Sequence, residues 1–365
     1  MEKIKIGCYV GKWLGGGVEA CMMNYFKYID KKNFDFYFIC DEDSTKIPYD
    51  DIKKLGGYVV LVPAYQKIFK FIKEFKKVCK ENKFDIVHSN VNLLSVFPLY
   101  AAKKSGIKVR VAHSHSTSNK REWKKNIFKN TLKPFSKLYA TDYFACSELA
   151  GRYQFGNKTF DKGLVTIINN AIEVDKFKFD EKIRKEKRKE LNIEDSTLVV
   201  GHIGRFVEQK NHSFLIDIFK EVNKDNKDSV LLLAGEGPLQ DMIKDKVKNL
   251  NLENSVLFLG QRSDARELYQ AMDVFVLPSL YEGLPVVGVE AQASGLQCLL
   301  SDDMTKETKI VDSTLFLSRK NGVSVWSEKI ISLQKLDILK EIDEKYNIKN
   351  EIKKIEKKYY IFIDR

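Results

Sequence analysis

Short apolar runs alternate with longer amphipathic stretches along the first half of the chain. The runs lack a strict alternation of polar and apolar residues, which is typical of strands in a parallel sheet with helices on both faces. They lie at residues 3–10, 34–40, 58–62, 84–89, 107–113, 142–146 and 164–168. Residues 66–82 instead show helical spacing, so we predict a helix there. Its apolar stripe comprises Ile68, Phe69, Phe71, Ile72, Phe75, Val78 and Cys79.

The same alternation resumes in the second half, after a charged stretch without a strand between residues 170 and 195. The later runs lie at residues 197–204, 229–235, 255–260, 272–279 and 297–301. Two such series predict an α/β protein with two tandem doubly wound, Rossmann-like domains. We place the first domain at 1–175 and the second at 176–340. Residues 341–365 form a basic amphipathic helix that we expect to pack back on the first domain.

Length and composition indicate the number of domains, the charge of a partner and the cellular compartment. The 365 residues suit two domains, and the net charge of +12 favours an anionic partner, although a general compositional bias explains it equally well. Six cysteines without a C-x-x-C pair indicate a reducing cytoplasm. The N-terminus is predicted to be a strand and not a signal peptide. No run reaches the ~18 apolar residues that span a bilayer, so membrane contact would be peripheral.

Two cations follow the strand predicted at 197–204. Arg205 comes directly after this strand, and Lys210 precedes a helix that begins near His212. A guanidinium, an ammonium and a helix N-terminus together suit a diphosphate. Solvated loop cations are the ordinary alternative.

Two glutamates, Glu282 and Glu290, flank a mostly apolar segment of sequence YEGLPVVGVE. Pro285 suits the first turn of a helix, which would place Glu282 in the preceding loop and Glu290 inside the helix. The peptide N–H groups around Gly283 and Leu284 would then favour an anion. The two carboxylates are expected to bind hydroxyl groups. A surface carboxylate is the alternative for Glu290, but its neighbours are apolar.

The strings GRFVEQKN, AGEGP and FLGQRSDARELYQAMDVFVLPSLYEGLPVVGVEAQASG resemble the nucleotide-binding domain of family 4 retaining glycosyltransferases of GT-B architecture. The E-x7-E motif of that family corresponds to Glu282 and Glu290. LGGGVEACMMNYFKYID and VRVAHSHST resemble the glycine loop and the strand-end histidine segment of its first domain. The resemblance covers most of the chain. Gln297, where the family often has proline, is a departure that affects local geometry.

The resemblance implies roles for these residues. Arg205 and Lys210 would hold the donor diphosphate, together with the peptide groups of Gly283 and Leu284. Glu290 would bind the nucleotide ribose, and Glu282 would contact hydroxyls of the transferred sugar.

In the first domain, the resemblance places the glycine loop with Gly16 and Gly17 near the donor and the acceptor. A histidine at the end of strand 107–113 would lie near the reacting sugar. The spacing favours His115, with His113 as the second candidate. Packing or strand capping is the alternative for either ring.

Other motifs leave alternatives open. Gly15, Gly17 and Ala20 satisfy G-x-G-x-x-A, with Asp41 after the second strand, so an NAD-linked oxidoreductase is one rival. The pair His113 and His115 suggests a metal, but no third ligand has suitable spacing. The D-x-D at 41–43 more simply makes an acidic loop. We therefore expect no metal. We also expect no cofactor, because the nucleotide sugar is a substrate.

Residues 120–139 combine lysines at four-residue spacing with aromatic and aliphatic side chains. This composition is typical of a helix that lies on an anionic membrane surface, although Pro134 interrupts it and an ordinary amphipathic helix is the alternative.

The predicted function is that of a retaining, metal-independent hexosyltransferase. It would use a UDP-sugar donor and a saccharide or lipid-linked saccharide acceptor in capsular or exopolysaccharide assembly. The protein would be cytoplasmic or peripheral at the inner face of the membrane, without a nucleic-acid partner. A non-catalytic subunit that only binds the donor is the second rival.

Overall fold

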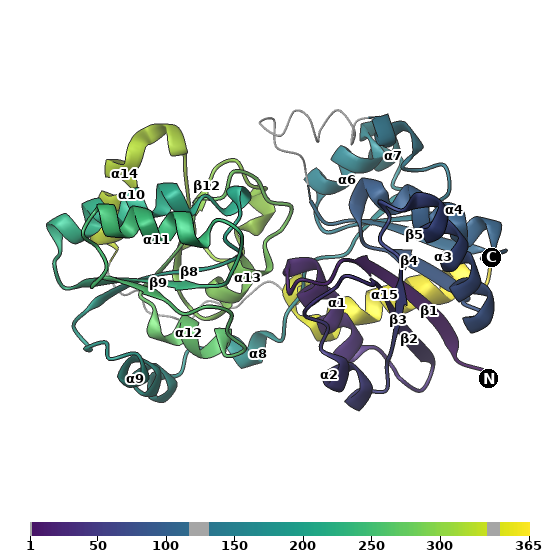
Figure 1. Cartoon of the computed structure of the whole chain (residues 1–365), viewed down its shortest axis with the longest axis horizontal. Coiled ribbons are helices and arrows are strands. Elements are labelled where there is room, and N and C mark those ends of the chain that lie inside the picture. The colour runs from purple at the N-terminus through teal and green to yellow at the C-terminus, as the bar shows by residue number, and fades with distance from the viewer. Residues whose placement is uncertain (1, 117–130, 334–343) are drawn as a thin grey trace. The chain divides into compact units, whose positions relative to one another are not determined.

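The computed structural model describes residues 2–116, 131–333 and 344–365 (Figure 1). The chain divides into two compact units, residues 1–171 with 345–365 and residues 172–344. Each unit is a parallel sheet with helices packed against it, so the predicted class of two tandem doubly wound α/β domains is confirmed.

Unit 1 contains, in its described residues, a seven-stranded sheet of order β3-β2-β1-β4-β5-β6-β7. Its strands are β1 (Ile4–Gly11), β2 (Phe34–Asp41), β3 (Tyr58–Val62), β4 (Ile86–Ser89), β5 (Val109–Ser114), β6 (Asp142–Ala145) and β7 (Val165–Ile167). Its helices are α1 (Gly17–Tyr28), α2 (Tyr49–Lys54), α3 (Ile68–Asn82), α4 (Val96–Lys104), α6 (Glu148–Phe155), α7 (Asn157–Asp161) and α15 (Ile348–Ile363). Short 3₁₀ turns are η1 (Asn92–Ser95), η2 (Lys133–Phe135) and η6 (Glu344–Tyr346). All seven strands coincide with the predicted apolar runs.

Helix α3 corrects one detail of the predicted apolar stripe. Phe71, Phe75 and Val78 are buried, but Phe69 is 88% exposed. Phe71 lies two positions after Phe69, which is a rotation of about 200° on a helix, so the two side chains point in nearly opposite directions. Phe69 therefore lies on the solvent side.

Unit 2 contains, within its described part, a six-stranded sheet of order β10-β9-β8-β11-β12-β13. Its strands are β8 (Leu198–Ile203), β9 (Ser229–Ala234), β10 (Val256–Phe258), β11 (Val274–Leu277), β12 (Gln297–Ser301) and β13 (Leu315–Leu317). Its helices are α8 (Val174–Phe177), α9 (Glu181–Glu190), α10 (His212–Asp225), α11 (Gln240–Asn249), α12 (Ala265–Ala271), α13 (Val286–Ala293) and α14 (Gly322–Ser332). The 3₁₀ turns are η3 (Glu208–Lys210), η4 (Lys306–Thr308) and η5 (Arg319–Asn321). The edge strand β13 has three partly buried residues and was not predicted.

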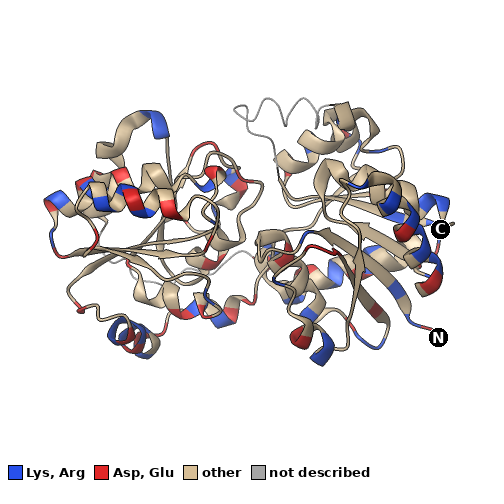
Figure 2. Ribbon diagram, in the orientation of Figure 1, with Lys and Arg blue, Asp and Glu red and all other residues tan. Residues whose placement is uncertain are grey.

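Successive strand residues of unit 2 enter two different cores. In β11, Val274 and Val276 join a cluster that includes Trp326 of α14, whereas Phe275 and Leu277 join a cluster that includes Tyr269 of α12. Alternate strand residues point to opposite faces, so both faces of the sheet are covered. The strands carry no Lys, Arg, Asp or Glu in the described part of unit 2 and appear tan in Figure 2.

Helix α15 returns to unit 1 and joins its core (Figure 1). Tyr359 lies against the rings of Phe34 and Phe144. The carboxylate of Glu351 accepts a hydrogen bond from the backbone N–H of Asn169 at 2.7 Å. The last helix thus contributes buried side chains to the fold of the first unit.

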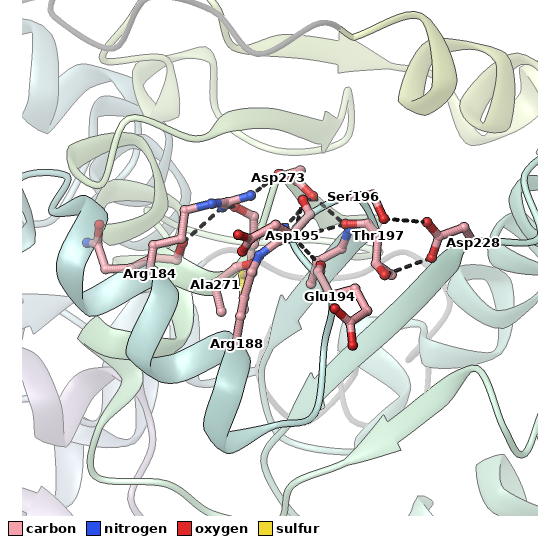
Figure 3. A network of polar contacts seen from close by, with 12 residues as sticks. Arg184, Arg188, Glu194, Asp195, Ser196, Thr197, Asp228, Ala271 and Asp273 are labelled. Atoms are coloured by element: carbon pink, nitrogen blue, oxygen red, sulfur yellow. Dashed lines mark hydrogen bonds and ion pairs between the residues drawn. The ribbon is translucent and has the colours of Figure 1, made fainter.

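The charged stretch between the strand series contains α9, which is anchored in unit 2 (Figure 3). Arg184 and Arg188 each bind one oxygen of Asp273, at 2.6 and 2.7 Å. The Arg188 guanidinium also donates to four backbone carbonyls, those of Glu194, Asp195, Thr197 and Ala271. Two buried cations therefore share one carboxylate just before β11 begins.

Candidate functional site

The loops after β8 and β11 meet at the carboxyl edge of the unit 2 sheet. The backbone N–H of Leu280 donates to the carbonyl of Gln209 at 2.8 Å, and the Asn211 amide donates to the carbonyl of Pro278 at 3.3 Å. In open α/β sheets, ligands bind at this edge. The contacts join two segments that lie about 70 residues apart in the sequence.

Lys210 and Glu282 form an ion pair across these loops. The Lys210 ammonium lies 2.7 Å from Oε1 of Glu282, and the amide of Gln209 donates to Oε2 at 3.1 Å. Glu282 is buried, with an exposed fraction of 7%. An ammonium has three donors, so Lys210 can hold Glu282 and still donate to a phosphate oxygen.

Arg205 lies in the same loop as Lys210 and is partly exposed. Its guanidinium has no hydrogen-bond or ion-pair partner among the residues that the structure describes. A guanidinium in this state is available for bidentate binding of a phosphate.

Two glycines of the loop after β9 allow the close approach of the Arg205 loop. A Cβ atom on Gly235, where φ is +135°, would lie 2.1 Å from the carbonyl oxygen of Gly204. A Cβ atom on Gly237 would lie 2.5 Å from the carbonyl oxygen of Phe206. The AGEGP string therefore positions the backbone that carries Arg205.

Glu290 lies inside α13, and the peptide groups of Gly283 and Leu284 precede this helix, whose N-cap is Pro285. The Tyr269 hydroxyl donates to Oε2 of Glu290 at 2.9 Å. Burial raises the pKa of Glu290 to about 7, and the Tyr269 hydrogen bond opposes part of this rise. A carboxylate held in an apolar setting with few donors gains from additional donors, such as the two hydroxyls of a ribose.

Two histidines that the sequence analysis did not single out lie beneath the loop that carries Arg205 and Lys210. The His202 ring donates from Nδ1 to the carbonyl of Val276 at 2.8 Å, and His212 lies beside His202 with ring centroids 4.7 Å apart. Burial lowers the pKa of His202 to about 4 and that of His212 to about 2, with a smaller effect of the Lys210 charge on each. Both rings are therefore neutral near pH 7. No pattern in the sequence predicts that these two histidines lie below the two cations.

In unit 1, the glycine loop connects β1 to α1. Gly16 is the N-cap of α1 and Gly17 is its first residue. The space where a Cβ atom of Gly17 would lie is open, with no described atom within 4 Å. The carboxylate of Glu19 accepts a hydrogen bond from the backbone N–H of Leu14 at 3.0 Å and so holds the loop.

The two candidate histidines lie together at the carboxyl end of β5. The rings of His113 and His115 are 3.9 Å apart, and both residues are buried. Nε2 of His113 and Nδ1 of His115 have no partner in the described part of the chain. The two histidines are thus in contact, and both rings remain candidates for a site in unit 1.

Other predicted ligand groups have structural partners. Asp41 accepts a hydrogen bond from the Tyr9 hydroxyl at 2.7 Å, and Asp43 pairs with Lys12 at the same distance. Within the described residues, no group of three or more His, Cys, Asp or Glu could hold a metal ion. No described helix is long and apolar enough to cross a bilayer.

Comparison with known proteins covers nearly the whole chain. Residues 15–176 match the family model "Glycosyltransferase Family 4", and residues 183–354 match "Glycosyl transferases group 1". The putative glycosyltransferase EpsF of Bacillus subtilis is 36% identical over 324 residues, which cover 86% of this chain and 84% of that protein.

Two further proteins are similar over their full length. The Escherichia coli UDP-Gal:alpha-D-GlcNAc-diphosphoundecaprenol alpha-1,3-galactosyltransferase is 27% identical over 388 residues, covering 100% of this chain and 97% of that one. The crystal structure of Anabaena HepE in complex with UDP and glucose superimposes with a TM-score of 0.80 at 17% identity. That match covers 98% of this chain and 100% of HepE, and shows a shared fold.

Proposed function

Because the chain belongs to the family 4 glycosyltransferases and has their two-domain GT-B fold, we propose that it transfers a sugar from a UDP-sugar to a saccharide acceptor with retention of configuration. Its membership in this family agrees with the resemblance noted in the sequence and does not support the oxidoreductase alternative.

The guanidinium of Arg205, which has no partner among the described residues, carries the proposal together with Lys210 of the same loop. The two cations lie in one loop at the carboxyl edge of the unit 2 sheet, and Glu282 is held against Lys210. Charge-assisted hydrogen bonds from such a pair would bind the donor diphosphate and stabilise the negative charge that grows on it as the bond to the sugar breaks. The UDP in the HepE complex and the UDP-Gal in the name of the E. coli relative support a uridine donor.

The carboxylates would bind the neutral parts of the donor. Glu290, which accepts a hydrogen bond from Tyr269 in the described chain, would accept from the ribose hydroxyls, and Glu282 would accept from hydroxyls of the transferred sugar. Retention requires that the acceptor attacks from the face that the phosphate leaves. The departing phosphate oxygen can then take the acceptor proton, so that no protein nucleophile is needed. The enzyme would act mainly by positioning and by electrostatic stabilisation.

Unit 1 would bind the acceptor, with Gly16, Gly17 and the pair His113 and His115 as the candidate contacts. A lipid-linked saccharide of surface polysaccharide assembly is the proposed acceptor, supported by the diphosphoundecaprenol in the name of the E. coli relative. The side chains of Arg205 and Lys210 can neutralise the diphosphate without a metal ion, so we expect transfer to continue in the presence of EDTA.

We also propose that unit 1 contacts an anionic membrane surface next to η2. Phe135 and Leu138 are 49% and 53% exposed, and Lys133 and Lys137 lie in the same short stretch. Residues 120–130 of the predicted segment 120–139 lie outside the described residues. Exposed apolar side chains near lysines are typical of interfacial segments.

Calorimetric titration of UDP and GDP at fixed ionic strength tests the donor site. We expect UDP to bind, and Arg205→Ala to weaken binding by about ten- to a hundredfold, the effect of one lost charge-assisted contact. Lys182→Ala, which removes an exposed lysine of α9, is the matched control and should leave the affinity unchanged.

Three results would contradict the proposal in different ways. GDP binding without UDP binding would change the donor base. Absence of binding by either nucleotide would favour the non-catalytic subunit, or a donor that is not a nucleotide. UDP binding that Arg205→Ala leaves intact would move the diphosphate to another part of the chain.

A further inference from the structure

A chain of hydrogen bonds connects the last helix of the protein to the candidate histidines of unit 1. The Tyr359 hydroxyl of α15 lies 2.7 Å from Nδ1 of His88, and Nε2 of His88 lies 3.0 Å from Nδ1 of His113. His88 lies in β4 and His113 in the adjacent strand β5. The chain ends at Nε2 of His113, which has no partner among the described residues.

Each ring in this chain carries one proton near neutral pH. Burial lowers the pKa of His88 to about 3 and that of His113 well below its usual value, and it raises the pKa of the Tyr359 hydroxyl. A neutral imidazole has one N–H donor and one lone pair. The proton on each ring can therefore be assigned from its neighbours.

The Tyr359 hydroxyl determines the direction in which the hydrogen bonds of this series donate. If it donates to Nδ1 of His88, then Nε2 of His88 carries the proton and donates to Nδ1 of His113, which leaves an N–H at Nε2 of His113. In the reverse direction, the Tyr359 proton has no acceptor in the described chain, although the residue is only 2% exposed. A buried donor without a partner is costly, so the first direction is favoured.

His115 is oriented by a separate group, Asn90. The Asn90 amide nitrogen lies within 3.4 Å of the carbonyl oxygens of Tyr9 and His88, so its oxygen points the other way. That oxygen lies 2.9 Å from Nε2 of His115 and must accept a proton from it. Nδ1 of His115 consequently carries a lone pair, and it has no partner among the described residues.

We propose that Tyr359, acting through His88, and Asn90 set the protons of the two candidate histidines so that the pair binds one sugar hydroxyl. His113 offers an N–H at Nε2, and His115 offers a lone pair at Nδ1, on rings 3.9 Å apart. A hydroxyl donates one hydrogen bond and accepts others, so it fits both atoms, whereas a carboxylate or an ammonium fits only one. Tyr359, His88 and Asn90 are thus positioning residues, and the identity of the ligand as a sugar rests on the proposed function.

Nitrogen NMR of the full-length protein with ¹⁵N-labelled histidine tests the proton positions directly. The chain has five histidines, which single His→Gln variants would assign. We expect Nε2–H tautomers for His88, His113 and His115. His202 is an internal reference with the opposite tautomer, because its Nδ1 donates to the carbonyl of Val276.

The variant Tyr359→Phe removes the hydroxyl that orients the chain. We expect a mixture of tautomers at His88 and His113, with His115 and His202 unchanged, which also shows that the variant is folded. Tyr25→Phe is the matched control, because the Tyr25 hydroxyl is equally buried in unit 1 but donates to the backbone carbonyl of Asn169. It should leave all five rings unchanged.

Transfer kinetics with a UDP-sugar and an acceptor then test the hydroxyl contact. Tyr359→Phe should lower kcat/KM by about three- to tenfold, the effect of one hydrogen bond, while the affinity for UDP in unit 2 stays the same. A general loss of structure would lower both kcat/KM and the affinity for UDP.

The outcomes separate this inference from the proposed function. An Nδ1–H tautomer of His113 in the wild type, or unchanged tautomers in Tyr359→Phe, would overturn the role of Tyr359 whatever the activity. Changed tautomers with the kcat/KM of Tyr25→Phe would overturn the hydroxyl contact. The expected tautomers in a protein that binds no nucleotide would support the positioning and overturn the proposed function instead.

Discussion

At the scale of single residues, Glu290 is the group of the candidate donor site whose charge is set by its surroundings. It lies in a helix whose other side chains are apolar or small except for Gln292, and Tyr269 is its hydrogen-bond donor. Because burial raises its pKa to about 7, a large share of the molecules carry a protonated Glu290 at neutral pH. Ribose hydroxyls that donate to the carboxylate would favour its charged form and lower this pKa.

The affinity for a UDP-sugar should therefore rise with pH between about 6 and 8, with release of a proton on binding near pH 7. The sign follows because the free protein holds the proton and the complex excludes it. Calorimetry in two buffers of different ionisation enthalpy measures the released proton. A UDP-sugar is the better probe, because UDP itself has a terminal phosphate that titrates in this range.

Glu290→Gln is the matched variant, because it keeps the shape of the side chain and cannot titrate. It should abolish the proton release. The histidines below the loop do not interfere, since the pKa values of His202 and His212 are lowered to about 4 and about 2. Proton release that persists in Glu290→Gln would assign it to another group.

At the scale of elements, α9 is held in unit 2 by the hydrogen bonds and ion pairs of its buried arginines. Arg188 is 1% exposed, and each of its three guanidinium nitrogens donates to at least one acceptor, among them Asp273. The same carboxylate binds Arg184 and accepts from the backbone N–H of Val199 at the start of β8. Figure 3 shows this convergence on Asp273. Removal of one partner from such a group leaves buried charge without compensation.

Asp273→Asn should accordingly lower the free energy of unfolding of unit 2 by about 3–5 kcal/mol. Chemical denaturation followed by circular dichroism measures the change. Glu186→Gln removes the acid of an exposed pair with Lys182 on the same helix and should cost less than about 0.5 kcal/mol. Equal effects of the two substitutions would mean that the buried network does not stabilise the unit.

At the scale of the whole molecule, the net charge of +12 would favour the proposed binding to an anionic membrane surface. Electrostatic attraction to an anionic surface adds to the burial of exposed apolar side chains, and it weakens as salt screens the charges. The exposed Phe135 and Leu138 beside η2 supply the apolar part in the described chain.

The protein should co-sediment with phosphatidylglycerol vesicles, more weakly with phosphatidylcholine vesicles, and less at high salt. The double variant Phe135→Ser, Leu138→Ser should reduce this binding. Leu164→Ser, which changes another exposed leucine of unit 1, should not. Equal binding to both kinds of vesicle, or equal binding by both variants, would contradict the membrane proposal.

The sequence alone determined the fold class and most of the donor-site motif. Apolar runs and helical periodicity are local properties, so twelve of the thirteen described strands and the start of α10 near His212 could be predicted. Arg205, Lys210, Glu282 and Glu290 lie in continuous motifs, each beside the end of a strand. The edge strand β13 escaped prediction because its apolar run is only three residues long, and the buried arginines of α9 escaped it because they lie in a highly charged stretch.

Only the tertiary structure decided which groups meet and how they are charged. The contacts of Lys210 with Glu282, and of Tyr359 with His88, join residues 72 and 271 positions apart. No local pattern encodes such pairs, because they depend on how the strands are ordered and on where the last helix returns. The pKa of Glu290 and the proton positions on His113 and His115 likewise follow from burial and from neighbours that only packing brings close.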